Sequence, residues 1–351
     1  MYLKHIVKED ESGRTAEYIL RQKLAVSNRL CKRIRDERAL KSNGVHIFNK
    51  AIVSAGDILE VNYFEDNEPR ENLQLNVNIE VLFEDEWYII VNKPPLLPTH
   101  PRFPGDPALT TVLSDYNLRA SNRLDTGTSG IVVLAKNAYA HDLITKVPMH
   151  KIYIGLVHDI VKPADGIFNA PIGREEGTII FRKVREDGKA AKTHYRSLAS
   201  WEDNKVTLLA YLLETGRTHQ IRVHNRYFGH PMVGDQFYGW EQTYRFKAEV
   251  HDGKTGYYLQ RDDRNFKDAS LERDFQALKI NRELQRQFLH AYILCLNHPI
   301  TQEKLFIKAD IADDLSRLLD KLQKGSEQNI DYSKITELLE IKVSANVVAE
   351  D

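Results

Sequence analysis

The feature that most constrains the fold is a series of strand-like runs in the middle of the chain. Six runs between residues 81 and 214 are rich in Val, Ile and Tyr and are either continuously apolar or alternating, as in a buried or half-buried sheet. They are Val81–Phe83, Tyr88–Val91, Gly130–Ala135, Tyr153–Val157, His194–Ser200 and Lys205–Glu214. Fewer helices are evident, and Ala138–Thr145 is the clearest short one. The pattern predicts an α+β domain with a mixed, mostly antiparallel β-sheet, flanking helices and a cleft.

The segment before this sheet predicts a small α/β module over residues 1–64. Apolar residues recur at helical spacing after residue 15, and Ser27 can cap a second helix that runs to about Arg38. Two short strand-like stretches follow this helix. They are Gly44–Phe48 and Asp57–Tyr63, and Gly56-Asp57 marks the turn before the second.

Basic residues are concentrated in this module, although the net charge of the whole chain is only −1. Residues 21–50 hold nine Lys and Arg against Asp36 and Glu37. Such a local patch on a neutral chain favours a polyanion bound at one place. The alternative is an ordinary solvated helix face. The bases expected to share one face are Arg29, Lys32, Arg33 and Lys41.

The rest of the chain divides by composition. The polar stretch 65–76 predicts a linker, and residues 77–310 predict the main domain, interrupted by a charged insertion at 240–285. Residues 311–351 predict a helical extension, with amphipathic helices near 311–323 and 331–342.

Composition also narrows the class of protein. No apolar run approaches the ~20 residues that a membrane helix needs, and the N-terminus lacks the apolar core of a signal peptide. Cys31 and Cys295 are the only cysteines and form no CxxC pair, so neither a disulfide framework nor a zinc site is indicated. A cytoplasmic monomer without a membrane partner is expected.

The first candidate for chemistry is Asp125, in the loop Asn122–Gly130. This loop is rich in Gly, Thr and Ser and leads into the apolar strand Ile131–Leu134. An acid at this place could lie on the floor of a pocket. The alternative is a turn residue that accepts hydrogen bonds from nearby backbone N–H groups, which for an isolated Asp is the commoner case.

The second candidate segment is Thr215–His224, at the end of a predicted strand. Gly216 can make a tight turn that leaves Arg217 pointing into a cleft, where it could pair with a carboxylate and keep it ionised. The alternative roles for Arg217 are a structural ion pair or a contact with a phosphate. The spacing of His219 and His224 does not place both on one side of a strand and no third ligand is close, so no metal is expected.

Lys93 begins a stiff loop, Asn92-Lys93-Pro94-Pro95, at the end of a predicted strand. A lysine at this place is a candidate partner for a phosphate or a carboxylate. A surface turn explains the same residues equally well.

Together these segments resemble the RluA-type family of pseudouridine synthases over roughly residues 80–310. Arg123-Leu124-Asp125, Thr128-Ser129-Gly130 and Ala135-Lys136 match its central signature, with Asn122 where histidine is usual. The second signature, Gly-Arg-Thr-His-Gln-Ile-Arg-Val-His, is present in full at 216–224. Several further motifs agree in order. They are Val91–Pro94, Lys151–Tyr153, Gly229–Pro231, Gly234-Asp235, Leu289–Ala291 and His298-Pro299.

The N-terminal module resembles the alpha-L RNA-binding domain of a ribosomal protein. It departs from the usual Val-Asn-Gly turn, since Ile47-Phe48-Asn49-Lys50 stands there.

The resemblance implies an isomerase that breaks the N1–C1′ bond of a uridine in structured RNA, turns the uracil and rejoins it through C5. It needs neither a cofactor nor a metal. Family members act on large-subunit ribosomal RNA, which the accessory module favours, or on transfer RNA. A catalytic carboxylate either attacks the ribose or takes a sugar proton, and both routes remain open.

The resemblance also assigns roles to residues. Asp125 is the carboxylate, Arg217 its partner and Tyr153 the tyrosine that stacks on the uracil. Arg123 fills the space left by the flipped base and Ile221 is an apolar wall. Thr128, His219 and Lys93 are further expected contacts to the substrate.

Two other functions compete with this interpretation. One is an RNA-binding or ribosome-assembly factor that keeps the fold without the activity. The other is a nucleoside or glycoside hydrolase, which generally needs a second acid that the Asp125 signature does not supply.

Overall fold

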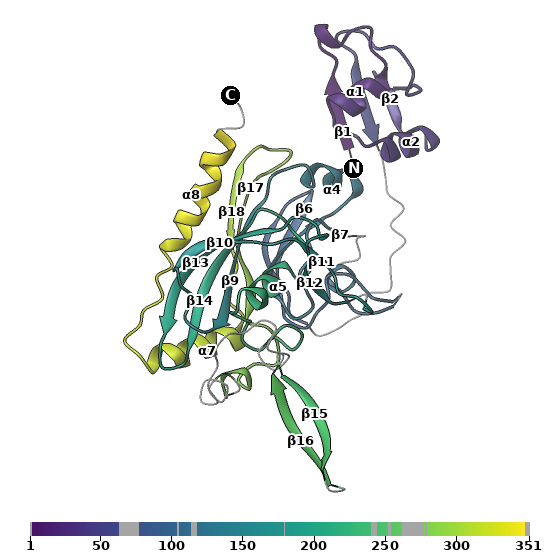
Figure 1. Cartoon of the computed structure of the whole chain (residues 1–351). Helices are drawn as coiled ribbons and strands as arrows, with labels where there is room; N and C mark the ends of the chain where they lie inside the picture. Colours follow the sequence, from purple (N-terminus) through teal and green to yellow (C-terminus); the bar gives the residue numbers. More distant parts are fainter. Residues whose placement is uncertain are drawn as a thin grey trace.

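The protein is described by a computed structural model that covers residues 2–62, 77–103, 105–113, 118–178, 180–239, 244–251, 254–261, 277 and 279–347 (Figure 1). The predicted linker 65–76 lies outside these residues, as does much of the predicted insertion at 240–285.

One large sheet organises the main domain. Among the described residues ten strands form it, in the order β10-β13-β14-β9-β17-β8-β6-β5, with β18 paired to β17 and β7 paired to β8. They are β5 (Glu80–Glu84), β6 (Tyr88–Lys93), β7 (Arg119–Ala120), β8 (Ser129–Ala135), β9 (His150–His158), β10 (Asp165–Asn169), β13 (Lys192–Trp201), β14 (Val206–Leu213), β17 (Leu289–Asn297) and β18 (Lys304–Lys308). The predicted α+β fold with a mostly antiparallel sheet is confirmed, and each of the six predicted strand runs falls on a strand.

The sheet contains one parallel pairing, at its centre. Strand β8 pairs with β17 only through Ser129–His290 and Gly130–Ala291, and every other named pair in the sheet is antiparallel. Gly130 has φ +110, and a Cβ there would lie 2.2 Å from the carbonyl oxygen of Ala291. The two halves of the sheet therefore join at a point that requires glycine.

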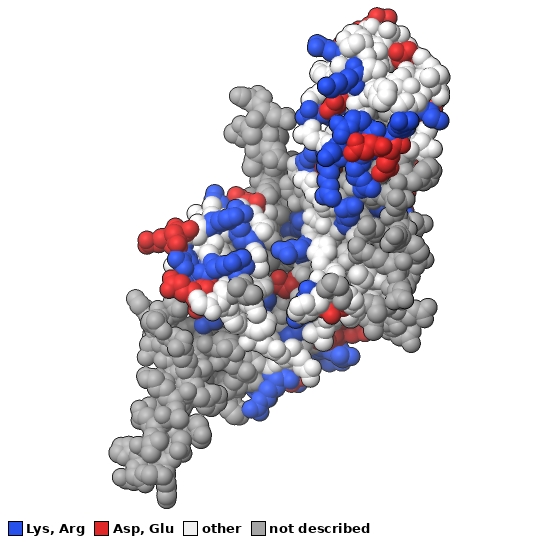
Figure 2. All heavy atoms as spheres, turned by 90° about the vertical axis from the view of Figure 1, so that its right-hand side faces the viewer, with Lys and Arg blue, Asp and Glu red and all other residues white. Residues whose placement is uncertain are grey.

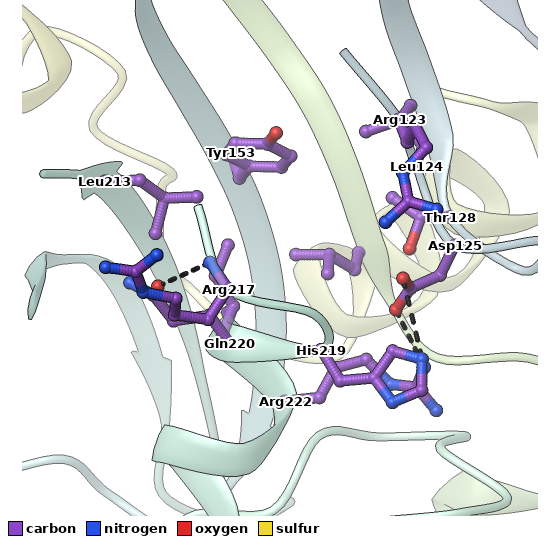
Figure 3. Close-up of a pocket in the computed structure, with 12 residues that line it drawn as sticks. Arg123, Leu124, Asp125, Thr128, Tyr153, Leu213, Arg217, His219, Gln220 and Arg222 are labelled. Atoms are coloured by element: carbon purple, nitrogen blue, oxygen red, sulfur yellow. Dashed lines mark hydrogen bonds and ion pairs between the residues drawn. The ribbon is translucent and has the colours of Figure 1, made fainter. Parts of the chain in front are cut away.

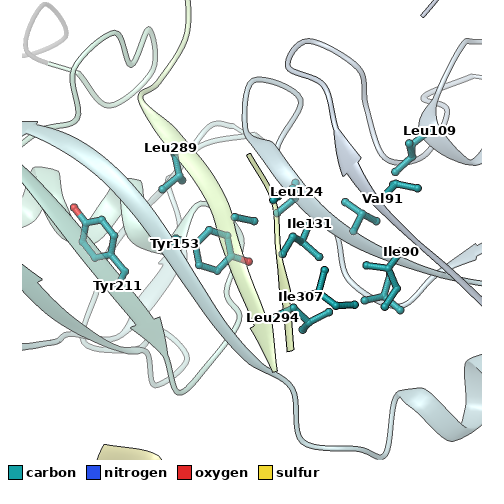
Figure 4. Close-up of a cluster of buried hydrophobic side chains, with 14 of the residues drawn as sticks. Ile90, Val91, Leu109, Leu124, Ile131, Tyr153, Tyr211, Leu289, Leu294 and Ile307 are labelled. Atoms are coloured by element: carbon teal, nitrogen blue, oxygen red, sulfur yellow. The ribbon is translucent and has the colours of Figure 1, made fainter. Parts of the chain in front are cut away.

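Side chains of the central strands alternate between two cores. On β9, Ile152 and Ile154 belong to one buried cluster. Tyr153 belongs to the other, which Figure 4 shows. On β14, Leu209 and Tyr211 lie on the Tyr153 side. Because successive side chains of a strand point to opposite faces, this register directs Tyr153 toward one face of the sheet.

Two C-terminal helices cover the opposite face. Helix α7 (Asp313–Lys324) buries Leu315, Leu318, Leu319 and Leu322 in the Ile152 cluster, and helix α8 (Lys334–Val347) adds Ile335 and Leu338. The two helices predicted near 311–323 and 331–342 are therefore confirmed.

The N-terminal module has its own sheet, in the order β1-β4-β2-β3, with two helices against it. Thr15 caps α1 (Ala16–Gln22) and Ser27 caps α2 (Asn28–Asp36), as the sequence predicts for Ser27. Tyr139 of helix α4 (Ala138–Ile144) completes the core of the module, so the module packs on the main domain at this helix (Figure 1). The strands are β1 (Tyr2–Ile6), β2 (Leu40–Ser42), β3 (Val45–His46) and β4 (Ile58–Asn62).

Some elements were not predicted. Residues 215–224, placed at the end of a predicted strand, contain the start of helix α5 (Gln220–Tyr227), a helix that was not predicted from the sequence. Further elements without a sequence prediction include strands β1, β2, β7, β10, β17 and β18 and the short helix α3 (Leu109–Val112). They also include the pairs β11 (Ile172–Arg174) with β12 (Arg182–Val184) and β15 (Tyr244–His251) with β16 (Lys254–Arg261), and the 3-10 turn Glu9–Glu11. Within the described ranges, none of the helices has the length and apolar character required to cross a bilayer.

The close approach at Gly130 leads to a stability prediction. We expect Gly130→Ala to lower the free energy of unfolding by about 2–3 kcal/mol, because the new methyl group meets the backbone of Ala291 in a conformation that alanine avoids. Urea unfolding followed by circular dichroism measures the change. Gly325→Ala is the matched control, since Gly325 has φ −87 and only carbonyl oxygens at 3.6 Å and beyond. Equal stability of both variants would contradict the prediction.

Candidate active site

A pocket opens where β8 and β17 begin side by side (Figure 3). Its walls come from the loop before β8, from β9 and β14, from the segment that leads into α5 and from the start of β17. The lining residues are Arg123, Leu124, Asp125, Thr128, Tyr153, Leu213, Arg217, His219, Gln220, Ile221, Arg222 and Leu289.

The loop that carries Asp125 is fastened at several main-chain atoms. The carbonyl of Thr126 accepts a hydrogen bond from Lys93 Nζ at 3.3 Å, and the carbonyl of Gly127 accepts one from Arg286 Nη1 at 2.9 Å. Asn122, at the position where histidine is usual, donates to Ile131 O and accepts from Val133 N, so it holds the loop against β8. The loop is therefore a rigid support for the carboxylate.

Asp125 is paired with Arg222. Nη1 of Arg222 donates to Oδ2 of Asp125 at 2.8 Å, and the carboxylate keeps 24% of its side-chain surface exposed. Nε and Nη2 of the same guanidinium donate to both oxygens of the fully buried Asp235, each at 2.7 Å. Since all these bonds join ionised groups, they are short and directional, and they fix where Asp125 points.

The two inner members of this chain of charges stabilise each other. Burial disfavours the charge of Arg222, but its hydrogen bonds and attraction to Asp235 and Asp125 outweigh burial and raise its pKa. Burial likewise opposes the charge of Asp235, but the bonds from Arg222 and from the backbone N–H groups of Tyr238 and Phe237 lower its pKa. Both groups stay charged inside the protein.

The predicted pairing of Arg217 with Asp125 is wrong. Nε of Arg217 donates to the carbonyl of Ala190 at 3.0 Å, and its exposed side chain lies on the other side of the pocket from Asp125 (Figure 3). Arg217 stands in the turn before α5, whereas Arg222 is carried by the helix and reaches the carboxylate.

The predictions that Lys93 contacts the substrate and that it pairs with a phosphate or a carboxylate are also wrong. Lys93 has no exposed surface, and its ammonium donates to the carbonyls of Pro94, Leu97 and Thr126. Burial is the main cause that lowers its pKa to about 7, with a further contribution from Arg286. Lys93 therefore supports the Asp125 loop from inside.

The other predicted residues lie at the pocket. Tyr153 and Ile221 are buried apolar walls on different elements, and burial raises the pKa of the Tyr153 phenol. Thr128 lies in the floor, where its hydroxyl accepts a hydrogen bond from Gln287. Arg123 is exposed at the mouth, above Asp125 in Figure 3.

His219 lies between the pocket and a buried tyrosine. Its Nε2 is 3.7 Å from Oδ1 of Asp125, and its Nδ1 is 2.8 Å from the hydroxyl of Tyr238. Burial is the main cause that lowers the pKa of His219; the charge of Asp125 opposes this effect and the charge of Arg222 adds to it. The ring is therefore neutral near pH 7.

Three residues of this arrangement were missed as site residues, namely Arg222, Asp235 and Tyr238. Arg222 and Asp235 stand within motifs noted in the sequence, but no role was assigned to either. A helical interpretation of 220–227 would have drawn attention to Arg222. Nothing in the sequence marks Tyr238, because its contact with His219 depends on the turn after α5.

The described residues hold no group of three or more His, Cys, Asp or Glu that could bind a metal ion. His224 is fully buried, where its ring nitrogens are 2.9 Å from Thr193 Oγ1 and 3.0 Å from the carbonyl oxygen of Ala170.

Comparison with known proteins agrees with this geometry. Residues 87–227 match the family model for RNA pseudouridylate synthase. Over 293 residues the chain is 31% identical to YjbO of Bacillus subtilis, an uncharacterized RNA pseudouridine synthase, which covers 80% of this chain and 89% of that protein. It is 32% identical over 296 residues to the ribosomal large subunit pseudouridine synthase D of Haemophilus influenzae, covering 80% of this chain and 82% of that one.

Among solved structures, the chain resembles human RNA pseudouridylate synthase domain containing 4. The identity is 21%, the TM-score is 0.49, and the match covers 72% of this chain and 94% of the human one. From the sequence relatives it follows that the chain belongs to the RNA pseudouridine synthases of the RluA type, and it is therefore an isomerase that acts on RNA.

Proposed function

We propose that the protein isomerises specific uridines of large-subunit ribosomal RNA, with Asp125 as the catalytic carboxylate. The observation that carries this proposal is the partly exposed carboxylate at the pocket floor, aimed by Arg222 and facing Tyr153 and Ile221. The target class is supported by relatives named ribosomal large subunit pseudouridine synthase D, of which one is 32% identical to this chain.

Asp125 acts on the ribose of the target nucleotide. Its Oδ2 is occupied by Arg222, and Oδ1 faces the pocket beside His219. A carboxylate at this place can attack C1′ as the glycosidic bond breaks, or it can take a proton from C2′. In either case the bond between C1′ and N1 of the uracil breaks, the uracil turns within the pocket, and C5 forms the new bond to C1′. In the first route this new bond displaces the carboxylate from C1′, and in the second the carboxylate returns the proton to C2′. The proton on C5 is then removed and N1 takes up a proton.

The uracil of the target nucleotide would lie against the apolar wall of the pocket. Tyr153 and Ile221 can hold a uracil between them, and no charged group on this wall competes with its hydrogen-bonding edge. Arg123, exposed at the mouth, fits the role of filling the space that a flipped base leaves in its stem.

Hydrolysis of the glycosidic bond is poorly served by the same site. Such enzymes generally use two carboxyl groups that both reach the substrate. The carboxylate nearest to Asp125 along the ion pairs is Asp235, which has no exposed side-chain surface and lies behind Arg222. It cannot protonate a leaving group in the pocket.

We infer that the N-terminal module binds RNA away from the pocket. Figure 2 shows Lys and Arg side chains gathered on the module, on its side toward the main domain. Arg29, Lys32 and Lys41 of the module are exposed, whereas Arg33 is half-buried with Glu37 3.6 Å away. Next to them a groove contains Lys50 and the exposed ring of Phe48, on which a base could stack.

Strand β8 extends from the pocket toward the N-terminal module, so its length indicates the distance between the pocket and the module. It begins beside Asp125 and ends next to α4, on which the module packs. Seven residues of strand correspond to roughly 20 Å. A substrate that uses both places must therefore extend well beyond the target nucleotide, which favours structured RNA.

The first prediction tests the catalytic carboxylate and the target together. We expect Asp125→Asn to lower the rate of pseudouridine formation about 10⁴-fold or more, because the amide is neither a nucleophile nor a base. Carbodiimide-directed primer extension on total RNA, with and without the protein, shows which uridine is modified. A modified position in transfer RNA would refute the ribosomal assignment, and an active Asp125→Asn variant would refute the role of Asp125.

The second prediction separates the two arginines. Arg222→Lys should lower kcat/KM about 100-fold, since an ammonium cannot donate to Asp125 and to both oxygens of Asp235 at once. The matched control Arg217→Lys keeps a charge at an exposed site that does not touch Asp125 and should change kcat/KM less than about fivefold. Similar losses in both variants would contradict the assignment of Arg222.

The third prediction concerns the module. Its deletion would uncover Tyr139, so substitutions are the sharper test. Changing Arg29, Lys32 and Lys41 to Ala should reduce the salt dependence of RNA binding by about 2–3 in the slope of log K against log [salt], since each phosphate contact releases counterions. The matched control changes Arg317, Lys321 and Lys324 to Ala, on a helix that covers the opposite face of the sheet. An equal change of slope in both triple variants would count against the module as the binding place.

A further inference from the structure

His219 approaches Asp125 through an unusual backbone conformation. It precedes α5 with φ 59 and ψ 19, in the left-handed region that residues other than glycine seldom adopt. This turn directs the imidazole toward Asp125 (Figure 3). Conformations of this kind persist where surrounding contacts hold them, and they concentrate at functional sites.

Tyr238 decides which ring nitrogen of His219 carries the proton. The Tyr238 hydroxyl accepts a hydrogen bond from the backbone N–H of Arg182 at 2.8 Å and lies 2.8 Å from Nδ1 of His219. In the described part of the chain these two groups are the hydrogen-bonding neighbours of the Tyr238 hydroxyl. Because the N–H of Arg182 donates to the hydroxyl, the hydroxyl proton is directed to Nδ1 of His219. Burial of the phenol is the main cause that raises its pKa, so it keeps this proton. A neutral His219 therefore carries its hydrogen on Nε2.

The pocket then presents a donor beside an acceptor. Nε2–H of His219 and Oδ1 of Asp125 are 3.7 Å apart, which is too long for a direct hydrogen bond. An oxygen atom about 2.8 Å from both would subtend an angle of roughly 80°, which a bridging hydroxyl tolerates. A group that accepts from Nε2 and donates to Oδ1 completes the pair.

Among the sugar and phosphate groups of an internal nucleotide, RNA offers one group of this kind. The phosphate oxygens and O4′ only accept, and O3′ is esterified, whereas the 2′-hydroxyl both donates and accepts. It also lies on the face of the ribose opposite the base, which is the face from which a carboxylate attacks C1′. We propose that His219 recognises the 2′-hydroxyl of the target uridine, which accepts a hydrogen bond from Nε2 and donates one to Oδ1 of Asp125.

This recognition rests on the proposed role of Asp125 and adds a ribose-specificity residue to it. His219 touches the substrate, and Tyr238 is a positioning residue that acts through His219. By this arrangement the enzyme distinguishes ribose from deoxyribose at the reacting nucleotide itself, independently of how tightly it holds the rest of the RNA.

The test compares two oligonucleotides that span the mapped uridine and differ only in ribose or 2′-deoxyribose at that nucleotide. The single-turnover rate is measured with each, and the ribose preference is their ratio. Loss of the hydroxyl also alters the intrinsic reactivity of C1′, but this contribution is the same for every variant and cancels when the ratios are compared. A merely structural defect lowers both rates and leaves the ratio unchanged.

We expect His219→Leu and Tyr238→Phe to reduce the ribose preference, the former by about tenfold. His219→Asn should behave as His219→Leu, because asparagine tolerates the left-handed turn but its amide is too short to reach. His219→Gln should restore part of the preference, since its amide nitrogen can reach the place of Nε2. A ribose preference that is unchanged in both His219→Leu and Tyr238→Phe would overturn the proposal.

Failure of the underlying function gives a different result. If Asp125 were not the catalytic carboxylate, Asp125→Asn would retain activity on the ribose oligonucleotide. If only the recognition by His219 were incorrect, Asp125→Asn would be inactive while every His219 variant kept the ribose preference of the unaltered protein.

Discussion

The site depends on one buried chain of charges, Asp235–Arg222–Asp125. Two carboxylates share one guanidinium, so these three side chains together carry one excess negative charge. Asp235 has no exposed side-chain surface and Arg222 has 3%, whereas Asp125 keeps 24%, so the excess charge is best solvated at the pocket end. Because Asp235 takes Nε and Nη2, Nη1 is left for Asp125. The buried pair thus aims the carboxylate, and breaking the bonds between Arg222 and Asp235 would leave the buried charge of Asp235 without its partner.

The fold brings together the segments that this chain of charges needs. Asp125 precedes β8, Arg222 lies on α5 and Asp235 follows that helix, while β17 begins beside β8 at the close contact of Gly130 with Ala291. Strands that begin side by side place the loops before them at one edge of the sheet. The cations Lys93 and Arg286 then hold the main chain of the Asp125 loop, so the position of the carboxylate is set by the interior of the protein.

The sequence predicted the sheet well because its strands are apolar, and it predicted the site less well because the supporting groups are polar. Helix α5 escaped notice since its buried face consists largely of Gln220, Arg222, His224 and Asn225, which give no apolar periodicity. Arg217 was assigned from the turn at Gly216 and from the resemblance, and neither reveals that α5 carries Arg222 to the carboxylate. Lys93 was misjudged because its partners are main-chain carbonyls, which no residue type reveals. The resemblance to a family located Asp125, but only the packing identified what holds it.

The basic module lies away from the pocket, so its positive charge is kept apart from the negative charge of Asp125. The guanidinium nearest to Asp125 is already used by two carboxylates, and a phosphate held against the exposed carboxylate would be repelled. The module lies about 20 Å away along β8, which is more than two Debye lengths at physiological ionic strength. Under the proposed function, the positive charge of the module would attract RNA without neutralising the carboxylate. The proposed binding through phosphates and the proposed chemistry at the ribose would then be independent in electrostatic terms, although β8 extends from one place to the other.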